Sequence, residues 1–184
     1  MEFFLPIVFL FISFIYSSIG LGGGSSYTAL MAIIGINYQL IPTTSLTLNL
    51  VVTFIGMVNF WRSGHGRFDL VWPFLVTSIP MAYIAGSLNL PELVFQIILT
   101  GTLILVALRI YIIDSLTITY QLSMVQKWIM IVFLGAILGF VAGSVGIGGG
   151  IYLVPLIIIF GLGSTKEASA AGAMFIWANS FAGF

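Results

Sequence analysis

The sequence predicts an all-α integral membrane protein, a polytopic helix bundle made of two homologous repeats. Hydrophobic residues make up 60% of the chain and charged residues 5%, with a mean hydropathy of +1.22, whereas soluble domains carry about a quarter charged residues. No charged residue lies in the middle of an apolar run. The runs lack the alternation of barrel strands, and backbone groups in lipid must be satisfied within their own segment, so we expect helices.

Eight apolar segments follow one another, separated by short polar or Gly/Pro breaks. They lie at about 3–19, 25–36, 43–61, 70–88, 92–113, 128–145, 151–162 and 167–184. The first is expected to be a retained transmembrane helix and not a signal peptide, because its start carries Glu2 and no Lys or Arg. Most segments are long enough to span a bilayer. The segments at 25–36 and 151–162 have only about 12 residues where a span needs about 20, so they are half-spans, re-entrant segments or shielded short helices.

A glycine heptad occurs twice, each time directly before one of the two short segments. Residues 18–24 read Ser-Ile-Gly-Leu-Gly-Gly-Gly and residues 144–150 read Ser-Val-Gly-Ile-Gly-Gly-Gly, so five of the seven positions are identical. We interpret this as duplication, with a first transmembrane repeat at 1–125 and an incomplete, truncated second repeat at 126–184. By this period a complete protein would have about 240 residues.

The order of segments bears on how the repeats are oriented. If the short segments cross the membrane, the number of segments between the heptads is odd and the repeats are inverted; if they are re-entrant, the repeats are parallel. Inversion is favoured because the 37–42 loop is uncharged while its counterpart at 163–167 contains Lys166. The positive-inside rule places the connections at 62–69 and 109–127 in the cytoplasm and 87–92 outside.

The heptads predict a binding site for an anion. Glycine lets a helix begin abruptly and lets backbone N–H groups approach a ligand, and helix N-termini attract negative charge. Short, glycine-interrupted segments at matching positions of two repeats point to the binding site of a transporter. The predicted cradle residues are Ser18, Gly22, Gly23, Gly24, Ser25, Ser144, Gly148, Gly149 and Gly150. The alternative is that these glycines, which have G-x-x-x-G spacing, serve close helix packing.

A second polar set lies in the helices that follow the short segments. Thr44, Ser45 and Asn49 open one of these helices, on one face by their i, i+4 spacing, and Asn179 and Ser180 lie in the matching helix of the second repeat. We expect them to bind the substrate from the two sides of the cradle. The alternative for each of these residues is a structural role, in which it caps a helix or forms a hydrogen bond to a neighbouring helix.

Other kinds of site are not supported by the sequence. Net charge is zero, there is no cysteine, and the single histidine, His65, is far from any paired carboxylate. We therefore expect no catalytic site, no metal, no cofactor and no nucleic-acid partner. The interior of the spans contains no Asp, Glu or His, which proton-coupled carriers usually need. If protons move, either further segments supply the acid or the substrate itself carries the proton.

These motifs resemble those of the TauE/SafE family of sulfite exporters. The resemblance covers essentially the whole chain and is carried by residues 18–24, 42–49, 62–65, 72–86, 146–155, 166–168 and 179–183. It implies a membrane permease, commonly of the bacterial inner membrane, that exports sulfite, sulfonate-derived or related small anions. The sequence departs from the family at Ala171-Gly172, where members often carry Thr-Ser, and it lacks the C-terminal spans expected of the family.

The expected function is therefore transport of small anions, of the sulfite or organosulfonate type, across a bilayer. The bilayer and the anion are the expected partners, and a homo-oligomer is compatible with the sequence. One rival is a passive anion channel. A rival from another class is a membrane scaffold subunit that transports nothing and uses its glycines for helix packing.

Overall fold

The computed structural model describes residues 4–112 and 124–184, and these two ranges form eight α-helices and no strand. The helices are α1 (Phe4–Ser18), α2 (Gly24–Ile33), α3 (Leu40–Arg62), α4 (Phe68–Ser87), α5 (Glu92–Ile112), α6 (Met124–Val145), α7 (Gly150–Ile159) and α8 (Thr165–Gly183). Each corresponds to one predicted segment, so the all-α prediction is confirmed. The middle of the predicted cytoplasmic connection at 109–127 lies outside the described residues.

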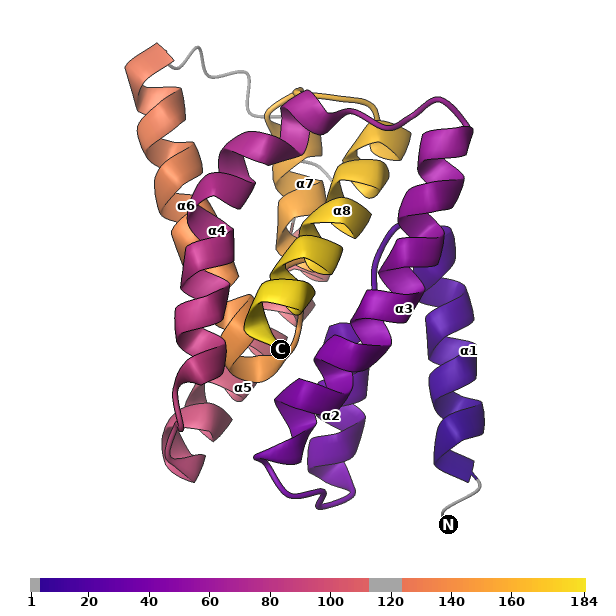
Figure 1. The fold of residues 1–184 in the computed structure, drawn as a ribbon, viewed down its shortest axis with the longest axis vertical. Coiled ribbons are helices and arrows are strands. Elements are labelled where there is room, and N and C mark those ends of the chain that lie inside the picture. The colour runs from indigo at the N-terminus through magenta and orange to yellow at the C-terminus, as the bar shows by residue number, and fades with distance from the viewer. Residues whose placement is uncertain (1–3, 113–123) are drawn as a thin grey trace.

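The two short helices begin inside the bundle and leave it at opposite ends. In Figure 1, α1 rises from the N-terminus, and α2 then starts at mid-height and descends to the loop before α3. α6 descends, and α7 then starts inside the bundle and rises to the loop before α8. We name residues 19–25 the first glycine break and residues 146–151 the second glycine break; each consists of a glycine-rich connection and the first two residues of the short helix that follows it.

Small residues bring α4, α6 and α8 into close contact. A Cβ on Gly139 of α6 would collide with the carbonyl oxygen of Ser78 in α4, and a Cβ on Gly86 of α4 would collide with the carbonyl oxygen of Gly183 in α8. Helices in lipid associate through such small-residue contacts, which let backbones approach closely. Glycines outside the two heptads therefore serve close helix packing in this part of the bundle.

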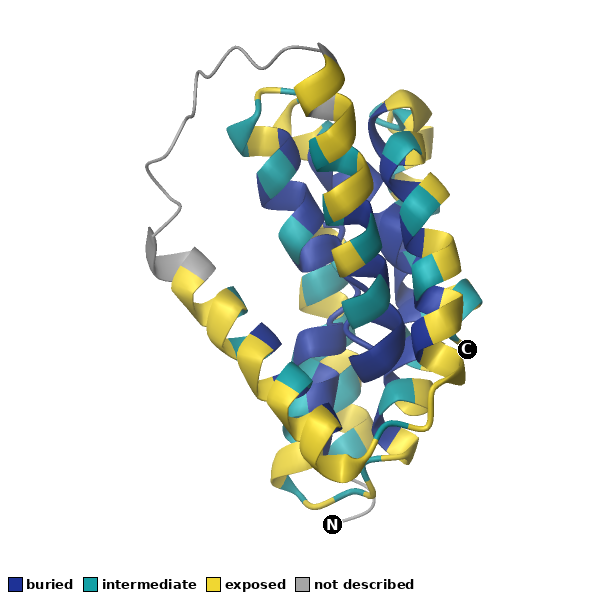
Figure 2. Ribbon diagram, turned by 90° about the vertical axis from the view of Figure 1, so that its left-hand side faces the viewer, coloured by how far each residue is buried: buried dark blue, intermediate teal, exposed yellow. Residues whose placement is uncertain are grey.

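The outer surface is apolar and the charges lie at helix ends and in loops. Large side chains such as Phe14, which is 77% exposed, and Ile33, which is 82% exposed, face outward, while buried residues gather along the middle of the bundle (Figure 2). Of the charged side chains that the structure describes, none is buried. Three helices, Leu40–Arg62, Phe68–Ser87 and Trp128–Val145, are long and apolar enough to cross a membrane. An exposed apolar surface of this extent fits contact with lipid.

Two hydrophobic clusters hold the glycine breaks between them. One is built on α4, α6, α7 and α8 around Phe74, Leu153 and Phe175. The other is built mainly on α2 and α5 around Tyr27 and Phe95 and includes Ile147 of the second break. Leu21 and Tyr152 pack against both clusters. The glycines of the breaks are therefore enclosed by packed side chains, whereas Ile19 at the start of the first break is 50% exposed.

Candidate functional site

The two glycine breaks share two left-handed glycine positions and differ at a third, because Gly148 has φ of 80° whereas its counterpart Gly22 has no positive φ. Gly20 and Gly146 have φ of 76° and 78°. The residues that cap the short helices, Gly23 and Gly149, have φ of 86° and 72°. Glycine is the residue that adopts this left-handed region without steric cost. Each break therefore turns the chain sharply and starts a helix of 10 residues.

The two breaks lie in direct contact. A Cβ on Gly24 would lie 2.6 Å from the carbonyl oxygen of Ile147 and 2.9 Å from that of Gly146. On its other side, a Cβ on Gly146 would lie 2.8 Å from Cα of Pro42 in α3. A Cβ on Gly20 would in turn collide with the carbonyl of Ser169 in α8. Only glycine allows the backbones to approach this closely, so the contact between the two heptads requires glycine for a steric reason.

Both breaks present backbone N–H groups that lack an acceptor. Within the described residues, no hydrogen bond is donated by the backbone N–H groups of residues 22–25 or 147–151. All of these residues are buried. Buried N–H groups without a partner are rare in proteins, and the N-terminus of a helix adds the positive end of its dipole. The arrangement can therefore accept a small anion.

Ser45 and Asn49 of α3 reach the breaks, as the sequence predicts for these two residues. Ser45 Oγ donates to the carbonyl oxygen of Gly146 at 2.7 Å, and Asn49 Nδ2 donates to the same oxygen at 3.1 Å. Both side chains are fully buried. Asn49 Oδ1 has no hydrogen-bond partner, and it lies where a Cβ on Gly22 would collide with it. Asn49 therefore contacts both glycine breaks.

Asn179 and Ser180 are also fully buried, but a different side chain of α8 lies beside the second break. A Cβ on Gly148 would lie 2.6 Å from Cγ2 of Ile176. Asn179 Nδ2 donates to the Phe175 carbonyl of its own helix at 2.8 Å. Asn179 Oδ1 and Ser180 Oγ have no hydrogen-bond partner. The two polar residues lie about one helical turn beyond the contact that Ile176 makes.

The remaining predicted hydroxyl residues differ in position. Ser25 and Ser144 are buried, with 6% and 5% of their surfaces exposed. Ser144 lines a cavity of about 300 Å³ with Pro42 and Thr43. Thr44 is exposed, because neighbouring positions on a helix point about 100° apart, so it does not share the buried face of Ser45.

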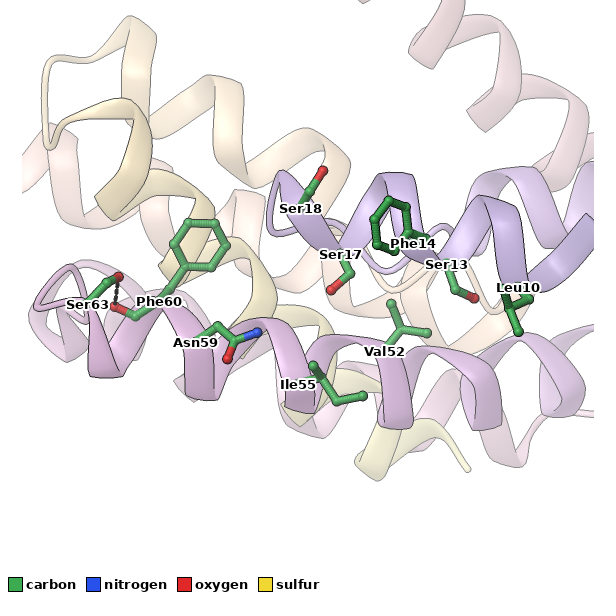
Figure 3. A pocket seen from close by; sticks show the side chains of 10 residues that line it. All are labelled: Leu10, Ser13, Phe14, Ser17, Ser18, Val52, Ile55, Asn59, Phe60 and Ser63. Carbon is green, nitrogen blue, oxygen red and sulfur yellow. Dashed lines mark hydrogen bonds between the residues drawn. The ribbon is translucent and has the colours of Figure 1, made fainter.

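Ser18 lies apart from the breaks. Its side chain is exposed, and its Oγ donates to the Ile15 carbonyl of its own helix at 2.6 Å. Ser18 lines a cavity of about 620 Å³ between α1 and α3, together with Ser17, Asn59 and Ser63 (Figure 3). The structure therefore brings neither Ser18 nor Thr44 to the cluster formed by the breaks.

Sequence reasoning missed Ile147 and Ile151, whose N–H groups are among those without an acceptor. An apolar side chain gives no sign that its backbone is a donor, although the position next to a repeated glycine is a usable signal. It also missed Ile176, which occupies the place beside Gly148.

The ion pairs that the structure describes lie at one end of the bundle and not at the breaks. Arg67, at the start of α4, pairs with Asp69 and lies 3.5 Å from Glu167 at the start of α8. This ionic cluster ties two loops at one end of the bundle. Among the described residues, no group of His, Cys, Asp and Glu side chains could hold a metal ion.

Comparisons with known proteins identify the family of this chain. The family described as "Sulfite exporter TauE/SafE" matches residues 5–184. The "Probable membrane transporter protein y4hK" of Sinorhizobium fredii is 31% identical over 180 residues, which cover 97% of this chain and 73% of that protein. The "Probable membrane transporter protein YjnA" of Bacillus subtilis is 26% identical over 172 residues, which cover 85% of this chain and 68% of that protein.

No solved structure is a significant match to the chain. The family match extends over nearly all of the sequence, and three of the described helices are long and apolar enough to cross a bilayer. The chain is therefore an integral membrane protein that belongs to the sulfite exporter TauE/SafE family.

Proposed function

We propose that the protein is a multi-pass permease of the bacterial inner membrane that moves small sulfur oxoanions such as sulfite or organosulfonates. The observation that carries this proposal is the pair of buried glycine breaks in contact, each with backbone N–H groups that have no acceptor. The name of the family supports the substrate class, and the names of the two relatives support membrane transport.

In this proposal, neutral donors hold the anion. Each helix N-terminus carries the equivalent of about half a positive charge, and α2 and α7 both begin at the breaks. Backbone donors at residues 22–25 and 147–151 surround the anion, with Ser45 and Asn49 beside them on α3. Asn179, Ser180 and Ser144 stand on the side of the second repeat, while Ser18 and Thr44 lie at the margins.

We also propose that the two halves, 1–125 and 126–184, are inverted repeats. Three observations support this: α2 and α7 have equal lengths and matching caps, they run in opposite directions (Figure 1), and the contacts of the breaks are reciprocal. Gly20 of the first half packs on Ser169 in α8, as Gly146 of the second half packs on Pro42 in α3. Inverted repeats with a site between broken helices suit alternating access.

The test is a flux assay on the purified protein in liposomes, with sulfite, sulfate, thiosulfate and methanesulfonate offered in turn. The proposal predicts flux of at least one sulfur oxoanion that saturates with concentration. Flux that rises linearly without saturation would indicate a passive channel. A folded protein that moves none of the anions would indicate a scaffold, whose glycines serve packing only.

A further inference from the structure

We infer that the transported anion carries a single negative charge and one hydroxyl hydrogen, as bisulfite does, and that Asn49 Oδ1 accepts the hydrogen bond from that hydroxyl. This inference rests on the proposed function and narrows its substrate. It starts from a buried side-chain acceptor at the breaks, Asn49 Oδ1, which has no hydrogen-bond donor.

The orientation of the Asn49 amide follows from its partner. A backbone carbonyl oxygen can only accept, so the Asn49 atom that lies 3.1 Å from the Gly146 oxygen is Nδ2, the donor. Oδ1 then points to the first break, beside Gly22. Asn49 is 0% exposed and Oδ1 has no hydrogen-bond partner. A buried acceptor left without a donor is unfavourable, so the arrangement calls for a donor on the ligand.

A fully deprotonated oxoanion cannot supply that donor. Its oxygens only accept, so they suit the free N–H groups of residues 22–25 and 147–151 but would repel Asn49 Oδ1. A protonated oxoanion satisfies both kinds of group, because its bare oxygens accept from the backbone while its hydroxyl donates to Oδ1. An acceptor without a donor, placed beside N–H groups without an acceptor, therefore favours a ligand that carries an O–H.

The charge of the site leads to the same class of ligand. Two helix N-termini amount to about one positive charge, and none of the buried side chains that the structure describes is charged. A monoanion is balanced by these dipoles. A dianion would leave a second charge buried without a counter-charge, which is strongly unfavourable.

The proposed ligand also accounts for proton movement without a protein acid. The described acidic residues are Asp69, Glu92 and Glu167, and each lies in the first turn of its helix and not at the breaks. A substrate that binds as the protonated monoanion moves one proton per anion with no carboxylate in the path.

The test compares two anions in liposomes that contain the purified protein, with protein-free liposomes as the background. Sulfite changes from monoanion to dianion near neutral pH, whereas methanesulfonate is a monoanion without a hydroxyl at every pH used. We expect sulfite flux to follow the bisulfite fraction and to fall about tenfold per pH unit once the dianion dominates. We expect methanesulfonate flux to be independent of pH and at least about tenfold slower than bisulfite flux.

Two variants test whether Asn49 is responsible for the preference for bisulfite. Asn49→Leu, which has no acceptor, should reduce the preference for bisulfite over methanesulfonate to less than about twofold, and Ser78→Ala serves as the matched control. Ser78 is likewise 0% exposed with an unpartnered side-chain oxygen, but it lies on α4. The control should keep the preference. The pH profile of the unaltered protein tests the inference even if the Asn49 variant does not fold.

The outcomes separate this inference from the proposed function. Saturable flux of both anions at equal rates and independent of pH would overturn the protonated ligand and leave anion transport standing. A requirement for Na⁺ that disappears in Asn49→Leu would also overturn it, because Oδ1 would then be a cation ligand. The absence of any anion flux from a folded protein would remove the proposed function and this inference together.

Discussion

Replacing Gly24 by alanine separates a binding role of the breaks from an ordinary packing role. The added Cβ would lie 2.6 Å from the Ile147 carbonyl oxygen, 2.7 Å from Asn49 Nδ2 and 2.9 Å from the Gly146 carbonyl oxygen. Two of these atoms belong to the backbone and cannot rotate away, so the breaks must move apart. Overpacking of this kind costs about 1–3 kcal/mol.

We therefore expect Gly24→Ala to lower the free energy of unfolding by about 1–3 kcal/mol and to reduce flux at least tenfold, because the N–H groups of the two breaks are moved apart. Thermal unfolding in detergent and sulfite flux in liposomes measure the two effects. The matched control is Gly56→Ala on α3, another buried glycine. Its Cβ would meet only ordinary contacts, the nearest at 3.6 Å from the Ser17 oxygen. If Gly24→Ala equals this control in stability and flux, the reasoning is refuted.

Four further substitutions, one of them a control, test the turns and the link to α3. Gly23→Ala and Gly149→Ala place a side chain at φ of 86° and 72°, which costs about 1–2 kcal/mol each, and both should lose flux. The control, Gly35→Ala, has the same backbone strain at φ 76°, but its Cβ would have no atom within 4 Å. It should therefore lose stability and keep flux. Loss of flux in all three variants would show that backbone strain alone is responsible. Ser45→Ala removes the 2.7 Å hydrogen bond to the Gly146 carbonyl oxygen. It should lower the free energy of unfolding by about 1–3 kcal/mol. A melting temperature equal to that of the unaltered protein would contradict this prediction.

Hydropathy and glycine positions predicted all eight helices. This was possible because each helix is an apolar run that a short polar or Gly/Pro break separates from the next. The differences are at helix ends. The apolar run after the first heptad continues to Ile36, but α2 ends at Ile33 because Gly35 adopts φ 76°. α3 begins at Leu40, earlier than predicted, since Pro42 is tolerated in the first turn of a helix.

The candidate site was only partly predictable. The repeated heptad identified both breaks, and i, i+4 spacing paired Ser45 with Asn49. The same argument wrongly grouped Thr44 with them, because a residue one position away on a helix faces another direction. The unpartnered state of Asn49 Oδ1 depends on a contact with Gly146, which lies far along the chain. No local sequence pattern predicts that contact, and none predicts the contact between Ile176 and Gly148.

Amide hydrogen exchange at the glycine breaks tests the central claim most directly. Exchange would be followed by mass spectrometry in the purified protein, with and without saturating bisulfite, in peptides that cover residues 22–25 and 147–151. Backbone N–H groups that bind the anion should exchange more slowly when it is present, in both breaks at once, while the loop at residues 34–39 should not change. Unchanged exchange in both breaks, under conditions where bisulfite is transported, would show that the anion binds elsewhere.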